Sequence, residues 1–131
     1  MSIEELYQAI GHLALENAPD LRGKLLAYAE VQEGVIESGM FYERGADRTV
    51  TFRYCTDQLE DRLYELWERW QETPGNAPWF GLAYLVQDGK LQIDLSYPEQ
   101  VNANEGLLDR RPRVIKKYFG EVPVDLSMPG D

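Results

Sequence analysis

The stretch "NAPWFGLAYLVQDGKLQIDLSY", residues 76–97, decides the fold class. An apolar run, residues 79–86, is followed by "QDGK" and then by an alternating run, residues 90–97. Asp-Gly at the centre of a turn is a strong hairpin signal, because Gly89 supplies the positive φ at no steric cost. In the alternating run every second side chain is apolar: Leu91, Ile93, Leu95 and Tyr97. The stretch therefore predicts a β-hairpin whose second strand has one buried face.

The segment upstream of this hairpin predicts three more strands. "KLLAYAEV" (24–31) is one, "MFYER" (40–44) is another, and Gly34 and Gly39 bracket a turn and a short strand between them. "RTVTFRY" (48–54) alternates apolar with polar residues, as a sheet with one wet face requires. The simplest account is three antiparallel strands joined by short turns.

Two helices flank these strands in the sequence. Ser2 with Glu5 forms a capping-box pattern, and "NAPD" (17–20) ends the helix that begins there. The second helix begins at Asp57 and is closed by "TPGNAP" (73–78). Its apolar positions recur at helical spacing: Leu59, Leu63, Leu66, Trp67 and Trp70.

The C-terminal part predicts one short helix after a polar connection over residues 98–109. Pro112 suits the first turn of that helix and Gly120 its end. The element order is then α-β-β-β-α-β-β-α, an α+β fold with helices packed on an antiparallel sheet of about five strands. Residues 1–120 form a single domain, and residues 121–131, which include two prolines, form an irregular tail.

Composition excludes several classes of function. The 131 residues include 13 basic and 23 acidic ones, for a net charge of −10, which argues against general binding of nucleic acid or anionic lipid. Cys55 is the only cysteine, so an internal disulfide and a Cys/His zinc site are not expected. Glu4 and Glu5 stand where a secretory signal has basic residues, and no apolar run reaches the length of a membrane span. We expect a cytoplasmic protein.

The sequence offers no identifiable catalytic centre. His12 and Cys55 are the only His–Cys combination, and nothing in the sequence brings them together. His12 is interpreted as a surface or boundary residue and Cys55 as a structural thiol. Gly34 and Gly39 lack the lysine and helix of a phosphate-binding loop. We therefore expect no catalytic residue, no cofactor and no metal.

Charged and aromatic residues cluster in three places. The second helix carries six carboxylates and two arginines, which fits either a solvated outer face or a negative surface for a positively charged protein. The three tryptophans, Trp67, Trp70 and Trp79, are interpreted as core residues. The positive cluster is interpreted mainly as an internal counterweight to carboxylates, with a partner contact as the alternative: Arg110, Arg111, Arg113, Lys116 and Lys117.

Taken together, these motifs resemble the YezG-like immunity proteins of bacterial polymorphic toxin systems. The resemblance runs through "LYQAIGHLALENAP", "LAYAEVQEG", "FYER", "LYELWERW" and "PWFGLAYLVQDGKLQIDLSY", and through "RR" leading to "YFG". The block from Trp79 to Tyr97 is its most specific part. The chain departs from the family pattern at Pro112, at Val114, where an aromatic is usual, and in the tail after Gly120.

The resemblance implies an inhibitor and not an enzyme: a protein that binds a cognate secreted toxin, commonly a nuclease domain. Such a domain presents a positive cleft, which an acidic helix could occupy. The candidate contact residues are Asp57, Glu60, Asp61, Glu65 and Glu68. A small acidic secretion chaperone for an exported effector is the main alternative, and a hydrolase using surface carboxylates is the weakest. The oligomeric state is left open.

Overall fold

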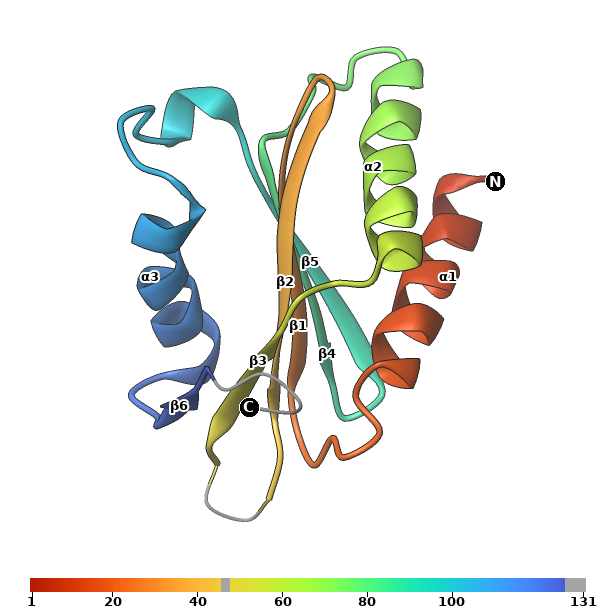
Figure 1. The fold of residues 1–131 in the computed structure, drawn as a ribbon. Coiled ribbons are helices and arrows are strands. Elements are labelled where there is room, and N and C mark those ends of the chain that lie inside the picture. The colour runs from red at the N-terminus through yellow and green to blue at the C-terminus, as the bar shows by residue number, and fades with distance from the viewer. Residues whose placement is uncertain (46–47, 127–131) are drawn as a thin grey trace.

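The computed structural model describes residues 1–45 and 48–126, which form an α+β fold with three α-helices and one mixed sheet (Figure 1). The helices are α1 (Ile3–Glu16), α2 (Asp57–Glu72) and α3 (Leu107–Phe119). The strands are β1 (Leu25–Gln32), β2 (Val35–Glu43), β3 (Val50–Arg53), β4 (Gly81–Gln87), β5 (Lys90–Ser96) and β6 (Val124–Asp125). The sheet order is β5-β4-β1-β2-β3-β6.

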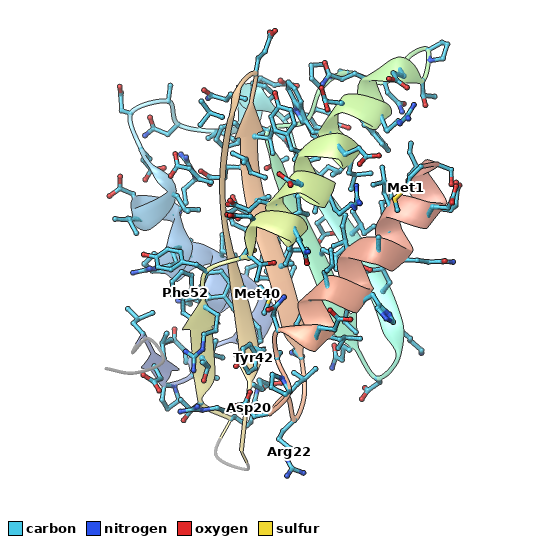
Figure 2. The ribbon with its side chains drawn as sticks, turned by 45° about the vertical axis from the view of Figure 1, so that its right-hand side comes forward. Met1, Asp20, Arg22, Met40, Tyr42 and Phe52 are labelled. Atoms are coloured by element: carbon cyan, nitrogen blue, oxygen red, sulfur yellow. The ribbon has the colours of Figure 1, made fainter. Side chains whose placement is uncertain are left out.

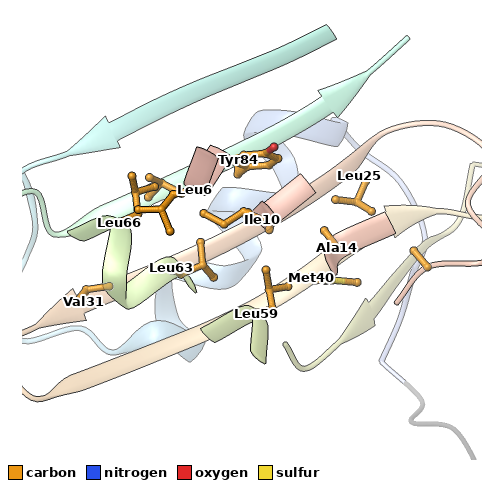
Figure 3. Packing of buried hydrophobic residues seen from close by; sticks show 14 of the residues in the cluster. Leu6, Ile10, Ala14, Leu25, Val31, Met40, Leu59, Leu63, Leu66 and Tyr84 are labelled. Carbon is orange, nitrogen blue, oxygen red and sulfur yellow. The ribbon is translucent and has the colours of Figure 1, made fainter. Parts of the chain in front are cut away.

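Both faces of the sheet are covered. Helices α1 and α2 lie on one face and α3 lies on the other (Figure 1). The larger core lies under α1 and α2, where Leu6, Ile10 and Leu63 pack on alternate residues of β1 and β4 (Figure 3). The smaller core lies under α3 around Ile115 and Phe119. Because side chains alternate along a strand, one sheet serves two separate cores.

The central strand β1 pairs antiparallel with β2 on one side and with β4 on the other. Seven of its eight residues are buried, and its sequence is nearly continuously apolar. A strand covered on both faces has no solvent-exposed side, so the alternation of apolar and polar residues typical of a half-exposed strand is absent. On its second side β1 is covered by the hairpin: β4 and β5 join the sheet beside β1 and not beside β3.

The predicted hairpin over residues 76–97 is confirmed. β4 and β5 pair from Gly81 with Ser96 to Gln87 with Lys90, and the turn residues Asp88 and Gly89 have φ values of 52° and 72°. The first strand begins two residues later than predicted, because Trp79 and Phe80 form the buried entry to it.

The prediction that Gly34 and Gly39 bracket a turn and a short strand is wrong at Gly39. β2 is one continuous strand, and only Gly34, with a φ of 81°, lies in a turn. Gly39 lies in mid-strand, and a Cβ there would clash with the ring of Phe52 on β3. Glycine is needed at position 39 because the Phe52 ring occupies the space of a Cβ, and this contact between strands has no local signal in the sequence.

The C-terminal helix is longer than predicted. α3 begins at Leu107, so Pro112 is its sixth residue and not part of its first turn. A proline at that depth removes one helical hydrogen bond, to the carbonyl of Leu108. Leu108 and Pro112 are both exposed. Water can therefore satisfy the free carbonyl, which is why the helix continues through the proline.

The predicted irregular tail contains a strand. Val124 and Asp125 of β6 pair parallel with Val50 and Thr51 of β3, which makes the sheet mixed and six-stranded where about five antiparallel strands were expected. The rest of the tail, residues 127–131, lies outside the described residues, as do residues 46–47 of the expected turn after β2. Within the part of the chain that the structure describes, no helix is both long and apolar enough to cross a membrane.

Candidate functional site

Helix α2 directs its carboxylates outward because its opposite face is committed to the core. Leu59, Leu63 and Leu66 are buried against the sheet and α1. At the N-terminus, the Thr56 hydroxyl accepts a hydrogen bond from the backbone N–H of Leu59 at 3.2 Å, which caps the helix. The rotation of α2 about its axis is therefore set, and the acidic residues must face water.

All five candidate contact residues line one open depression of about 850 Å³ on the outer side of α2. We call this depression the acidic groove, and define it by its complete lining: Ile36, Asp57, Glu60, Asp61, Tyr64, Glu65, Glu68, Arg69 and Glu72. Sequence analysis missed Tyr64 and Ile36. Tyr64 is four residues from both Glu60 and Glu68, so helical spacing alone could have placed it there. Ile36 comes from β2 and had no local signal.

The carboxylates of the acidic groove differ in how far they are already engaged. Glu65 accepts from Arg62 at 2.8 Å and lies 3.7 Å from the amino terminus of Met1. Glu60 accepts a hydrogen bond from the Ser38 hydroxyl. Among the described residues, no ion pair or side-chain hydrogen bond engages the carboxylates of three groove residues: Asp57, Asp61 and Glu68. These three present the most available negative charge.

The wall of the acidic groove is held by hydrogen bonds to neighbouring segments. The Tyr64 hydroxyl accepts from the backbone N–H of Gly34, in the β1–β2 turn, at 2.8 Å. On the other side of the helix, the indole N–H groups of Trp67 and Trp70 donate to the carbonyls of Trp79 and Ala77 at 2.8 and 2.9 Å. Both sets of contacts lie at the end of the sheet where β1 ends and β4 begins, and they fix the C-terminal half of α2 there.

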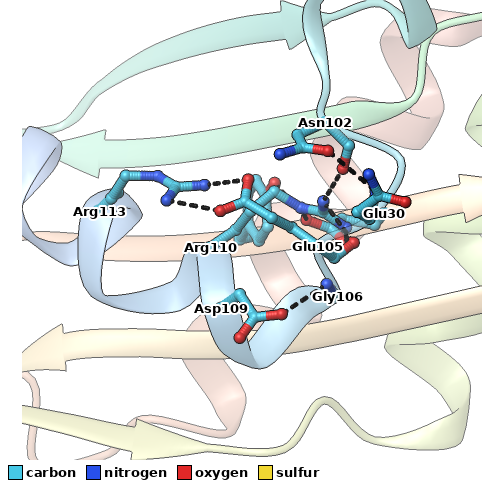
Figure 4. Close-up of polar contacts among 9 residues, drawn as sticks. Glu30, Asn102, Glu105, Gly106, Asp109, Arg110 and Arg113 are labelled. Atoms are coloured by element: carbon cyan, nitrogen blue, oxygen red, sulfur yellow. Dashed lines mark hydrogen bonds and ion pairs between the residues drawn. The ribbon is translucent and has the colours of Figure 1, made fainter.

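The basic cluster on α3 pairs largely with the chain's own carboxylates, as predicted. Arg110 donates to both oxygens of Glu30 at 2.6 and 2.7 Å, and Arg113 does the same to Glu105 at 2.9 and 2.6 Å (Figure 4). Lys116 lies 3.0 Å from Glu121. The remaining two members stack on aromatic rings, Arg111 on Phe52 and Lys117 on Tyr118.

Arg110 also connects the segment before α3 to the sheet. Its guanidinium donates to the carbonyls of Asn102 and Glu105, and it stacks over the Phe80 ring with 5.1 Å to the centroid. The Glu30 side chain is only 4% exposed. This buried pair is a structural contact. Sequence analysis did not single out Glu30, because it lies 80 positions from Arg110.

The isolated nucleophile and base candidates are not brought together. The His12 side chain is 83% exposed and lies 3.9 Å from Glu16 on the same helix. Burial raises the pKa of the Cys55 thiol to about 12, so the thiol stays protonated. Over residues 1–45 and 48–126, no group of three or more His, Cys, Asp or Glu side chains is placed to hold a metal ion.

The three tryptophans lie at or beside the core, as predicted. Trp79 is fully buried, whereas Trp67 and Trp70 are half-buried and pack against the larger core. None of them lines the acidic groove.

Comparison with known proteins adds no family assignment. A scan against protein-family models finds no match to the chain, and a search of curated proteins finds none either.

Proposed function

We propose that this chain is an immunity protein that binds a cognate secreted toxin, a nuclease domain, and neutralises it by stoichiometric binding. It acts in the cytoplasm of the producing cell, without a cofactor and without chemistry of its own. The observation that supports this proposal is the convergence of six carboxylates on one open groove; among the described residues, three of them have neither an ion pair nor a side-chain hydrogen bond.

The charge distribution supports a positively charged partner. The chain carries a net charge of −10, and most of its α3 cations are already paired or stacked internally. Its outward field at α2 is therefore negative. A nuclease domain holds a polyanion and must present a positive cleft, so the two surfaces attract each other and the complex blocks access of the nucleic acid.

The alternative is a secretion chaperone for an exported effector. A chaperone holds an unfolded segment along an apolar groove, because the segment's buried side chains must be covered. The lining of the acidic groove is mostly carboxylate, with Ile36 as its single aliphatic residue. This lining favours a folded, basic partner over an unfolded apolar one.

A titration tests the proposal. The candidate toxin is the C-terminal domain of any secreted protein found to be encoded beside this chain's gene. It is purified, and its activity on nucleic acid is measured while this chain is added. We expect inhibition that is complete at one equivalent, together with a complex of folded partners by solution mass. Undiminished toxin activity at a large excess of this chain would refute the proposal, and binding only to the unfolded domain would favour the chaperone.

A further inference from the structure

Strand β2 extends past the end of its neighbour β3 (Figure 1). β3 pairs with Met40–Glu43 only, and after Arg53 the chain leaves the sheet to begin α2. Residues 35–39 pair with β1 on one side. On their other side no strand lies among the residues that the structure describes. The sheet therefore has an open edge in its middle, where β3 has ended.

The backbone groups at this open edge can be assigned from two hydrogen bonds. The Glu43 N–H donates to the Lys24 carbonyl at 3.0 Å on the β1 side, and the Arg44 N–H donates to the Thr49 carbonyl at 3.3 Å on the β3 side. Successive residues of a strand direct their backbone groups to opposite sides. Ile36 and Ser38 therefore direct their N–H and C=O groups to this edge, where no described backbone group bonds to them. Ser38 is only 6% exposed and lies beside Cys55, so the accessible backbone groups of the open edge are those of Ile36.

The open edge forms one side of the acidic groove. Ile36 lines the groove together with eight residues of α2, and the Ser38 hydroxyl donates to Glu60 across it. The turn that begins β2 is fixed to the same wall through Gly34 and Tyr64. The backbone donor and acceptor of Ile36 and the carboxylates of Asp57, Asp61 and Glu68, which have no partner among the described residues, thus lie beside a single hollow although they come from different elements. Figure 2 shows α2 lying over the sheet beside β2.

The chemistry of the edge specifies its occupant. Natural sheets block exposed edges with lysine, proline or a bulge. Residues 35–39, "VIESG", contain neither lysine nor proline, and Glu37 adds a further exposed carboxylate on the face opposite α2. An edge of this kind pairs with an extended segment, and the carboxylates on both faces select one that carries lysine or arginine.

We propose that the partner inserts a basic extended segment as an added strand along residues 35–37 of β2, the accessible part of the edge that β3 does not cover. Side chains at alternate positions of that segment point into the acidic groove, and the others point toward Glu37. This inference rests on the proposed function, since it states how the partner is held. It differs from a purely electrostatic contact, because backbone hydrogen bonds carry part of the affinity.

A short peptide provides the probe. An acetylated, amidated octapeptide of alternating lysine and valine, labelled with fluorescein, is titrated with the full chain at low salt and followed by anisotropy. Amide hydrogen exchange is measured in parallel. We expect binding, and we expect the exchange of the Ile36 N–H group to slow by about tenfold or more, because it gains a backbone acceptor. The same peptide with glutamate in place of lysine should not bind.

Matched proline variants separate strand addition from charge attraction. Ile36→Pro removes a donor that points to the open edge and leaves the pairing with β1 intact. Leu91→Pro makes the same change on β5, whose odd-numbered residues face the outer edge on the far side of the sheet. We expect Ile36→Pro to weaken peptide binding about tenfold, while Leu91→Pro and Ile36→Val leave it unchanged. Circular dichroism verifies that each variant is folded.

The outcomes distinguish this inference from the proposed function. If the toxin is inhibited equally by the Ile36→Pro variant, strand addition is refuted and the immunity function stands. The same holds if the peptide binds without slowing the exchange of the Ile36 N–H, or fails to bind at low salt. If wild-type chain does not inhibit the toxin but the peptide binds with the expected protection, the edge is a binding site and the proposed function is wrong.

Discussion

Trp79 shows how a single residue connects helix α2 to the β4–β5 hairpin. It is 1% exposed and is the largest of the fully buried side chains. Its carbonyl accepts the Trp67 indole N–H, so the entry to β4 is fixed to α2. Among the described residues its own indole N–H has no hydrogen-bond partner, so its contribution comes from packing and not from polarity.

Truncation of Trp79 should be among the most damaging single changes. We expect Trp79→Ala to lower the free energy of unfolding by about 3–5 kcal/mol, the range for removing a large buried aromatic. Trp79→Phe should cost clearly less, because it keeps much of the volume and deletes the unpaired N–H. Urea denaturation followed by circular dichroism measures both variants. A loss below about 1 kcal/mol for Trp79→Ala would contradict the packing described here.

At the scale of elements, α3 is docked on the sheet by polar contacts as well as apolar ones. Its apolar contribution comes mainly from Ile115 and Phe119, while Arg110 pairs with Glu30 and the Tyr118 hydroxyl donates to Asp94 of β5 at 2.7 Å. Glu30 and Asp94 lie on the face of the sheet that α3 covers. The docking of α3 is therefore specific in position, because a shifted helix would leave buried charges unpaired.

The buried pair of α3 can be compared with an exposed one on the same helix. Glu30→Gln leaves the Arg110 guanidinium, only 13% exposed, without its counter-ion, and we expect a loss of about 3–5 kcal/mol in unfolding free energy. Glu105→Gln breaks a pair of the same geometry with Arg113, whose side chain is 62% exposed. Water solvates that charge, so the effect should be far smaller. Equal losses from the two variants would show that Glu30 is not buried as described.

The contact between Tyr118 and Asp94 predicts a dependence on alkaline pH. Burial, and then the hydrogen bond to Asp94, raise the pKa of Tyr118 above its usual value of 10.0. An acid whose pKa is raised on folding stabilises the folded chain below its unfolded pKa, and that stability is lost as the pH rises above it. Tyr118→Phe should therefore cost about 1 kcal/mol at neutral pH, and the difference from wild type should shrink above about pH 10. A difference that stays constant to pH 11 would contradict this.

At the scale of the whole molecule, negative charge is concentrated where positive charge is not available to balance it. The cations of α3 lie on the other side of the sheet from α2 and are mostly occupied there. A partner approaching α2 therefore meets a negative field, and this field should affect the rate of association more than the lifetime of the complex.

Charge reversal measures that field. We expect Asp61→Lys combined with Glu68→Lys to slow association with the toxin domain about tenfold at low salt and to flatten the salt dependence of the rate. Glu4→Lys combined with Glu99→Lys changes the net charge equally, at exposed residues that do not line the acidic groove. Stopped-flow fluorescence compares the two pairs. Equal on-rates for them would remove the acidic groove from the interface.

The elements of this fold could be predicted from the sequence wherever the signal is local. The Ser2–Glu5 capping box, the apolar spacing of α2 and the Asp88-Gly89 turn each act within a few residues, and each is found where it was expected. The same is true of the acidic candidates, because helical spacing alone places them on one face of α2. These features depend on backbone geometry and solvent exposure, which neighbouring residues determine.

Only the tertiary structure decided which elements meet. Gly39 has to be a glycine because of Phe52, α3 tolerates Pro112 because that face is in water, and β6 forms because β3 offers it an edge. The groove beside α2 and the open edge of β2 likewise depend on where β3 stops. Contacts between residues far apart in the sequence have no local pattern, since their free energy arises only when the sheet and helices are assembled.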